Sequence, residues 1–160
     1  MERSLAPILI SNIDDSAEPL FQGLYSKSMV TTKFGRPIGI VGVTTRGFFS
    51  GKLLILPEVE SVRDEVSKLK EQGINIIIVL SHCGLEIDRE IAKHSGDIDI
   101  IVGGHSHSFL YSGDNPPGPD NPVSFYPTVE TQENGHEVLI VQASAYTKYL
   151  GDITLYFDEE

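Results

Sequence analysis

The stretch DIDIIVGGHSHSFL, residues 97–110, joins an apolar run to a pair of glycines and a pair of histidines. Its IDIIV core is typical of a β-strand that is covered on both faces of a sheet. Gly103 and Gly104 follow this core, and they remove side-chain bulk at the point where the strand ends. His105 and His107 come next, separated by one serine. The stretch therefore predicts a buried strand that ends in a small turn carrying two imidazoles.

The chain before this stretch alternates helix-like and strand-like segments. Apolar side chains recur at helical spacing in residues 57–73, between a proline and a glycine that suit the two ends of a helix. Residues 74–82, INIIIVLSH, form a second apolar run, and residues 84–96 have the pattern of a shorter helix. The order helix, strand, helix, strand predicts a parallel α/β unit.

The rest of the chain adds further expected strands around this unit. They are residues 6–12, two strands within 29–45, and one strand each in 136–146 and 150–160. Gly39 and Gly42 indicate places where a neighbouring backbone approaches a strand closely. Residues 111–122, YSGDNPPGPDNP, are rich in turn formers and predict a surface loop.

Both apolar strands end in histidine, the first at His82 and the second at His105 and His107. In an open parallel sheet, ligand sites lie beyond the carboxyl ends of the strands, so the three imidazoles are expected at one edge. Side chains two residues apart in an extended turn would point to the same side. Neutral imidazole prefers Zn²⁺, Mn²⁺, Fe or Co²⁺ to Ca²⁺, so these residues are candidate metal ligands. His94, at a helix end, and His136, in a turn, are expected to be structural or solvated.

The three histidines leave two kinds of metal site open. Three imidazoles can hold one ion with a free coordination position. They can also form the closing half of a two-metal site, whose other ligands would lie upstream. Residues 1–56 contain no Asp-x-His, Gly-Asp or Asn-His-Glu motif that would supply them. Cys83 is expected to be a small buried hydrophobe, and Asp97 and Asp99 are expected to flank their strand in solvent.

The composition limits the class of protein and of partner. With 160 residues, the chain fits one domain of ordinary size. Its 12 basic and 23 acidic residues give a net charge of −11, which disfavours nucleic acid and anionic membranes as partners. A small anionic substrate is still compatible, because bound metal ions reverse the local potential. A single cysteine allows no intrachain disulfide, and neither a signal peptide nor a membrane span is expected from the apolar patterning.

Five segments of the chain together resemble one family. They are PILISNID, GIVGVTT, IIIVLSHCGLEIDREIAK, DIDIIVGGHSHSFLYSGDNPP and VLIVQASAYTKYLGDITLYFD, in this order along nearly the whole chain. These segments resemble the animal 5′-nucleotidases, which belong with the salivary apyrases to the calcineurin-like metallophosphoesterases. The resemblance implies an α/β fold that forms part of an αββα sandwich, in which helices flank two mixed β-sheets. It also implies hydrolysis of nucleoside 5′-monophosphates, AMP to adenosine and phosphate, with two divalent metal ions: zinc foremost, manganese or cobalt as alternatives.

The resemblance assigns roles to the three histidines. His82 in LSHCG and His105 in GGHSH match two histidine ligands of the same metal ion. His107 matches the position that contributes to the other ion, where some family members carry Asn or Gln. The small turn would thus let two neighbouring side chains address two neighbouring ions.

The resemblance also implies that part of the active site lies outside the chain. The family's first metal ligands, its bridging aspartate and its catalytic Asn-His pair precede the segment that matches Ala6, and its nucleotide-base domain follows the segment that matches Glu160. Residues 1–160 are therefore expected to be the C-terminal portion of the catalytic domain, with the N-terminal part missing and without a catalytic residue of their own. In isolation, the chain is expected to be inactive and to expose an apolar face that favours a homodimer. The parent protein is expected outside the cell or on its surface.

Three alternatives to a 5′-nucleotidase stay open. An apyrase would act on nucleoside di- and triphosphates, and that choice depends on residues outside this chain. The chain could instead be a non-catalytic metal-binding or interaction fragment. A mononuclear hydrolase with three histidine ligands is the third alternative.

Overall fold

The computed structural model describes residues 6–46 and 51–158. Within these residues, the strands are β1 (Ile13–Asp14), β2 (Ser28–Lys33), β3 (Arg36–Thr44), β4 (Leu54–Ile55), β5 (Ile76–His82), β6 (Ile100–Val102), β7 (Thr128–Thr131) and β8 (Glu137–Val141). The helices are α1 (Glu58–Glu71) and α2 (Leu85–His94), with a short 3₁₀ turn at Pro19–Phe21. The predicted α/β class is confirmed, and α1, β5, α2 and β6 follow in the expected order. Neither α1 nor α2, the helices of the described segments, is long and apolar enough to cross a bilayer.

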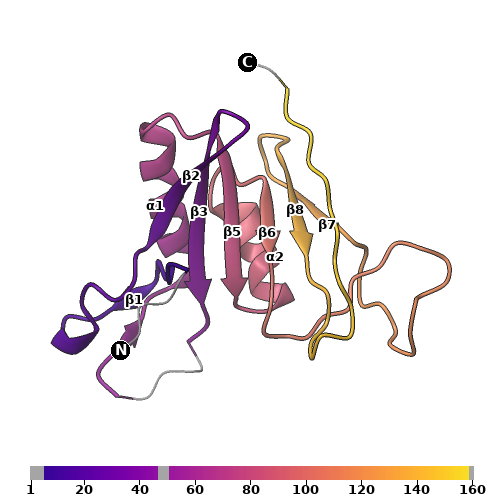
Figure 1. Ribbon diagram of the computed structural model, residues 1–160, viewed down its shortest axis with the longest axis horizontal. Helices are drawn as coiled ribbons and strands as arrows, with labels where there is room; N and C mark the ends of the chain where they lie inside the picture. Colours follow the sequence, from indigo (N-terminus) through magenta and orange to yellow (C-terminus); the bar gives the residue numbers. More distant parts are fainter. Residues whose placement is uncertain (1–5, 47–50, 159–160) are drawn as a thin grey trace.

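Most of the strands form one mixed six-stranded sheet (Figure 1). Its order is β2-β3-β5-β6-β8-β7. The four inner strands are parallel, whereas β2 and β7 run antiparallel at the two edges. The strands β1 and β4 pair as a separate two-stranded antiparallel sheet. The carboxyl ends of the four parallel strands therefore meet at one edge of the larger sheet, where ligand sites of open α/β sheets lie.

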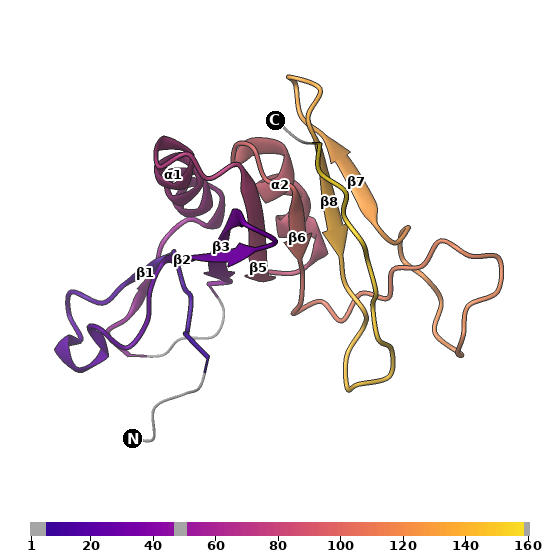
Figure 2. The same cartoon turned by 45° about the horizontal axis from the view of Figure 1, so that its top comes forward.

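Both helices cover the same face of this sheet (Figure 2). The buried side of α1 consists of Val62, Val66 and Leu69, whose spacing places them on one stripe of the helix. Fully burying an aliphatic side chain of this size stabilises a fold by about 1.5–3 kcal/mol. The sheet residues below the helices are neighbours across the strands, and four of them are Val41, Val79, Ile101 and Ile140. This core holds the parallel strands in register and thereby aligns their carboxyl ends.

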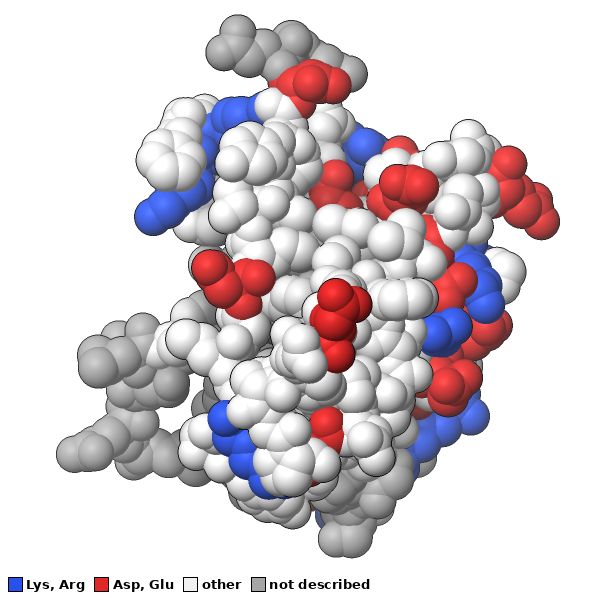
Figure 3. Space-filling model, turned by 90° about the vertical axis from the view of Figure 1, so that its right-hand side faces the viewer, with Lys and Arg blue, Asp and Glu red and all other residues white. Residues whose placement is uncertain are grey.

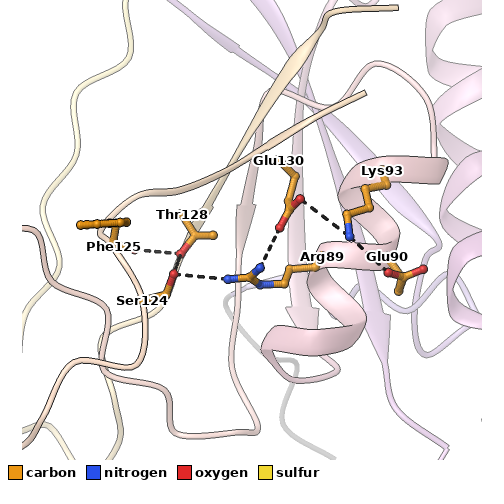
Figure 4. A network of polar contacts seen from close by, with 7 residues as sticks. All are labelled: Arg89, Glu90, Lys93, Ser124, Phe125, Thr128 and Glu130. Atoms are coloured by element: carbon orange, nitrogen blue, oxygen red, sulfur yellow. Dashed lines mark hydrogen bonds and ion pairs between the residues drawn. The ribbon is translucent and has the colours of Figure 1, made fainter. Parts of the chain in front are cut away.

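A polar network ties α2 to the edge strand β7 (Figure 4). Arg89 Nη1 lies 3.1 Å from Glu130 Oε1, and Arg89 Nη2 donates to Ser124 Oγ at 3.3 Å. Lys93 Nζ lies 3.8 Å from the other carboxylate oxygen of Glu130. Because the Glu130 side chain is only 14% exposed, solvent screens these pairs less than it screens a surface ion pair. The network therefore fixes α2 to the edge of the sheet that β7 forms.

The opposite face of the sheet exposes apolar side chains. Leu80 in β5 and Val102 in β6 are neighbours in the register, and they are 44% and 42% exposed. The C-terminal segment 150–158 lies beside β8 (Figures 1 and 2) and leaves both side chains partly uncovered. On the β7 side of the molecule, charged side chains of both signs are separated by broad uncharged areas (Figure 3). On this face of the sheet, two adjacent apolar side chains are thus partly exposed.

The expected strand at residues 6–12 does not form. Leu9 makes only an isolated bridge with Ser26. The buried side chain of Asn12 donates to the carbonyl oxygens of Thr44 and Leu56 at 2.7 and 3.2 Å. Side-chain bonds of this kind compete with a regular ladder, and here they tie the segment to the end of β3 and to Leu56.

The last part of the chain also differs from the expectation. Residues 150–158, the described part of the expected strand 150–160, are extended but pair with no neighbouring strand. Their contacts with β3 run through Arg36, which donates to the Asp158 carbonyl at 3.0 Å and lies over the Phe157 ring. Conversely, β7 is a strand that the sequence analysis does not predict. β7 and β8 form an antiparallel hairpin, and its turn contains Asn134-Gly135, a dipeptide that favours tight hairpins.

Candidate functional site

Two of the three predicted ligands lie together at the carboxyl edge of the sheet. His82 is the last residue of β5, and His105 follows the adjacent parallel strand β6 after two glycines. The centroids of the two imidazole rings are 5.2 Å apart, with the rings at 67° to each other. The parallel register explains this meeting, because Leu80 and Val102 pair just before the two strands end. The predicted convergence of His82 and His105 is therefore present.

His107 lies apart from this pair. Its ring faces the ring of Tyr146, with centroids 5.2 Å apart and an angle of 74°. His105 and His107 have φ angles of 69° and 54°, so both lie in the left-handed region. The turn is therefore not extended, contrary to the expectation, and the His107 ring packs against Tyr146. Within residues 6–46 and 51–158, no three His, Cys, Asp or Glu side chains form a metal-binding group.

Small residues allow the two histidine-bearing segments to touch. A side-chain carbon on Gly104 would lie 3.3 Å from His82 Nδ1 and 3.3 Å from the Ser81 carbonyl oxygen. A side-chain carbon on Gly84 would lie 3.5 Å from His105 Cδ2. Gly84 also has a φ of 91°, a conformation that favours glycine. Gly104, one of the two glycines predicted to keep this edge small, thus helps to bring His82 and His105 together, and Gly84, which was not predicted, does so as well.

A buried carboxylate lies behind the first of these histidines. Ser81 Oγ donates to Asp88 Oδ1 and accepts from the Cys83 amide at 3.1 Å. Asp88 is completely buried in the first turns of α2, and burial raises the pKa of its carboxyl group to about 6. The hydrogen bond from Ser81 acts in the opposite direction. The sequence analysis does not single out Asp88, although its spacing of three from Leu85 and Ile91 places a charge on the apolar side of a helix.

A hollow of about 470 Å³ borders His107, and His82 is not among its lining residues. Its lining includes Tyr146, Asp120 and Lys148. Lys148 Nζ donates to both carboxylate oxygens of Asp120, at 3.2 and 3.1 Å, and this bond lowers the pKa of Asp120. The carboxylate that lines this hollow with His107 is therefore already engaged by a lysine.

The remaining candidates have the surroundings expected of structural residues. His94 is the last residue of α2, and its Nε2 lies 3.7 Å from Glu90 Oε2. His136 Nε2 lies 2.8 Å from the Ile98 carbonyl oxygen. Cys83 is 4% exposed, and burial raises the pKa of its thiol to about 12, which suits a small buried hydrophobe.

Asp97 and Asp99 do not behave alike. Asp97 is exposed and lies 3.3 Å from Lys70 Nζ, as a strand-flanking residue in solvent does. The expectation is wrong for Asp99, which is half-buried and whose Oδ2 accepts from the Ile77 amide at 2.7 Å. Burial raises the pKa of Asp99. Its side chain ties the start of β6 to β5, at the end of the sheet remote from the histidines.

The chemistry of the His82–His105 pair fits a divalent transition metal. Neutral imidazole nitrogens are common ligands of zinc, manganese and cobalt ions and are poor ligands for calcium. Two imidazoles supply only part of a coordination shell, since a zinc ion in proteins takes four ligands as a rule. The residues at this edge therefore fit a share of a metal centre, with the other ligands coming from elsewhere.

Comparison with known proteins gives consistent matches. An apyrase from Tabanus yao is 52% identical over 159 residues, which cover 96% of this chain and 29% of the apyrase. A 5′-nucleotidase from Bos taurus is 41% identical over 162 residues, which cover 96% of this chain and 28% of that protein. The chain thus spans less than a third of the length of these curated relatives. No protein-family model matches the chain.

Solved structures agree with the sequence matches. The crystal structure of a 5′-nucleotidase precursor from Thermus thermophilus superposes with a TM-score of 0.78 at 34% identity, covering 86% of this chain and 28% of that one. A calcineurin-like phosphoesterase from Bacillus subtilis superposes with a TM-score of 0.61 at 20% identity, covering 88% of this chain and 47% of that one, and shows likeness of fold. By sequence and by fold, the chain belongs to the family of the 5′-nucleotidases and apyrases, which has the calcineurin-like α/β fold.

Proposed function

We propose that this chain supplies the histidine side of a two-metal centre that hydrolyses the phosphate esters of nucleotides. The observation that carries the proposal is the meeting of His82 and His105 on adjacent parallel strands, with their rings 5.2 Å apart. Membership in a family of nucleotide phosphate hydrolases supports it. The proposal is also supported by the location of these side chains at the carboxyl edge of the sheet, because active sites of open α/β sheets lie at this edge.

The three histidines divide between two ions in this proposal. His82 and His105 hold one divalent ion, and His107, whose ring packs against Tyr146, contributes to a second. We propose zinc for both positions, with manganese or cobalt as alternatives, because all three accept imidazole nitrogen. Such a pair of ions supplies an activated water and neutralises charge on the phosphate oxygens. The protein's part is to hold the imidazoles in a fixed orientation close to the substrate.

The rest of the active site comes from residues other than the histidines at the carboxyl edge of the sheet. We propose that residues 1–160 form the C-terminal portion of the catalytic domain, since the chain matches less than a third of each relative. The remaining metal ligands, the catalytic Asn-His pair and the nucleotide-base site then belong to other parts of the parent protein. The isolated chain is accordingly inactive. The parent protein acts outside the cell or on its surface.

The substrate proposed is a nucleoside 5′-monophosphate, with AMP converted to adenosine and phosphate. A second candidate, hydrolysis of nucleoside di- and triphosphates, is favoured by the higher identity to the Tabanus yao apyrase, 52% against 41% for the bovine 5′-nucleotidase. Both readings use the same histidines. Neither invokes nucleic acid or a membrane as a partner of this chain.

A segment exchange tests the proposal. Residues 6–158 replace the matching segment of the Tabanus yao apyrase, and phosphate release is measured from AMP, ADP and ATP. We expect His82→Ala and His105→Ala to lower turnover at least about a hundredfold, because even residues that only support a metal ligand cost about 10- to 100-fold when lost. His94→Ala is the matched control and keeps full turnover. An active exchange protein that tolerates His105→Ala, or one that releases no phosphate at all, contradicts the proposal.

A further inference from the structure

Gln142 lies behind the histidine turn with no role in the function proposed above. It follows β8 directly, and β8 is the parallel neighbour of β6 on the side away from β5. Its side chain is only 3% exposed. A buried amide needs hydrogen-bond partners, because leaving its polar atoms unpaired destabilises the folded chain. The partners of Gln142 therefore indicate what this side chain does.

All of these partners belong to one short turn. Gln142 Oε1 accepts from the Ser108 amide at 2.5 Å and from Ser106 Oγ at 3.2 Å. Gln142 Nε2 donates to the Gly104 carbonyl oxygen at 3.2 Å. The three bonded residues enclose His105 and His107 between them. One side chain thus spans the whole segment that carries two of the candidate ligands.

Ser106 extends this contact to the other histidine-bearing segment. Its Oγ accepts from the Leu85 amide at 3.1 Å and lies 2.8 Å from Ser108 Oγ. Leu85 is the first residue of α2, and it follows His82 by three positions. The hydrogen bonds therefore connect the end of β5, the start of α2 and the turn after β6. These are the segments whose meeting places His82 beside His105.

The turn needs such support because its backbone is unfavourable. His105 and His107 adopt φ angles of 69° and 54°, a region that residues with a side-chain carbon occupy less readily than glycine does. Hydrogen bonds to the backbone of the turn offset the cost of this conformation. The ring positions of both histidines then depend on the amide of Gln142.

We propose that Gln142 is a positioning residue of the candidate metal centre: its amide holds the turn of residues 104–108 so that His105 faces His82. The proposal rests on the proposed function for its metal, but the held turn is a property of the metal-free chain. The three hydrogen bonds of Gln142 go to backbone groups and to a serine hydroxyl, so its effect on metal binding runs through the turn.

The test compares Gln142→Met with a matched variant of the full 160-residue chain. Methionine keeps the length of the side chain and removes both polar atoms. Gln132→Met is the control, because Gln132 Nε2 also donates to two backbone carbonyls, those of Ala92 and Gly96 at 2.7 and 2.8 Å, at the opposite end of the sheet. Thermal unfolding verifies that both variants are folded and shows whether their losses of stability are comparable.

Two measurements are made on each variant. Amide hydrogen exchange, followed by NMR without metal, reports the Ser108 N–H, and zinc titration calorimetry reports affinity. Gln142→Met is expected to speed Ser108 exchange about tenfold, as loss of one hydrogen bond does. It is also expected to weaken zinc binding about 10- to 100-fold, the range for residues that orient metal ligands. Gln132→Met is expected to change neither.

The outcomes separate this proposal from the proposed function. If His105→Ala binds zinc as tightly as the unchanged chain does, the metal centre is wrong, and Ser108 exchange alone decides whether Gln142 holds the turn. If His105→Ala loses zinc while Gln142→Met keeps both zinc affinity and slow Ser108 exchange, the positioning role is overturned. Should Gln142→Met fail to fold, Ser106→Ala decides instead. It removes the link to Leu85 and is expected to weaken zinc binding several-fold, and unchanged affinity would overturn the proposal.

Discussion

Asp88 shows how one side chain couples the fold to the candidate site. It is fully buried, Ser81 donates to its Oδ1, and its Oδ2 has no hydrogen-bond partner among the residues that the structure describes. A side-chain carbon on Gly103 would collide with Oδ2, so the glycine leaves room for this carboxylate under the turn. Burial therefore raises the pKa of Asp88 from 3.8 to about 6.

The raised pKa predicts a falling stability with rising pH. Because the folded chain holds the Asp88 proton more tightly than the unfolded chain does, the contribution is fully present below 3.8 and is lost as the pH rises through about 6. A rise of about two pKa units corresponds to about 3 kcal/mol. Urea unfolding across this range should show Asp88→Asn gaining stability relative to the unchanged chain by roughly that amount. Parallel pH profiles of the two proteins would contradict the assignment.

Cys83 provides a second prediction at the scale of one residue. Burial raises the pKa of its thiol to about 12, so the thiolate fraction in the folded chain is very small. Iodoacetamide at a pH of about 8.5, the ordinary pKa of a thiol, should modify Cys83 slowly in the folded chain and rapidly in urea. Mass spectrometry of timed samples measures both rates. Equal rates in the two conditions would show that Cys83 is accessible.

At the scale of elements, close contacts at glycines decide which segments fit together. The sequence analysis expects close approach at Gly39 and Gly42 of β3, and both positions are crowded. A side-chain carbon on Gly42 would collide with the backbone carbonyl of Leu9, whereas one on Gly39 would lie 2.9 Å from the tip of the Leu69 side chain. Backbone yields less readily than the end of a flexible side chain, so the two glycines differ in how replaceable they are.

Alanine substitutions measure this difference. We expect Gly42→Ala to lower the free energy of unfolding by about 2–3 kcal/mol, because the segment carrying Leu9 must shift. Gly39→Ala serves as the comparison and should cost about 1 kcal/mol, since Leu69 can adopt another rotamer. Urea unfolding followed by circular dichroism gives both values. The reverse order of the two losses would contradict the packing described for β3.

The elements differ in how well the sequence predicts them, for physical reasons. The helix α1 is predicted because its periodic apolar stripe and its flanking proline and glycine are local signals. The segment around Leu9 is apolar like a strand, yet distant hydrogen bonds from Asn12 to Thr44 and Leu56 hold it out of the ladder. Such contacts, more than 30 residues apart, have no local signature.

The same distinction applies to the candidate site. The sequence predicts that His82 and His105 meet, because each follows an apolar strand and the carboxyl ends of parallel strands lie at the same edge of a sheet. The left-handed turn that separates His107 from them is not predictable in this way, because it is held by Gln142, 34 residues beyond Ser108. The sequence also does not predict that Asp88 is buried, since a carboxylate on a short helix ordinarily lies in solvent.

In the whole molecule, one face of the sheet is only partly covered in the described residues. Helices cover the other face, while Leu80 and Val102 stay 44% and 42% exposed side by side. Adjacent apolar side chains on a sheet favour association, which is the physical basis for the proposed homodimer of the isolated chain. Exposed leucines also occur on the loop around the 3₁₀ turn, where Leu20 and Leu24 are 87% and 46% exposed.

These two groups of residues allow a controlled test of association. Sedimentation velocity across a concentration series should show the unchanged chain associating. The Leu80→Thr, Val102→Thr double variant should stay monomeric, because it removes the adjacent apolar pair from the sheet face. The Leu20→Thr, Leu24→Thr variant removes more exposed apolar area, but from the loop, and should associate like the unchanged chain. A monomer at every concentration before any substitution would contradict the prediction.

Imidazole NMR shows directly whether the histidines at the carboxyl edge of the sheet bind metal. The chain has five histidines, so each ring gives a resolvable signal during a zinc titration of ¹⁵N-labelled protein. We expect the His82 and His105 rings to respond together at the lowest zinc concentrations and His107 to respond after them. His94 and His136 should keep their metal-free signals until zinc is in large excess. A first response at His94 or His136, or independent responses of His82 and His105, would contradict the proposed metal centre.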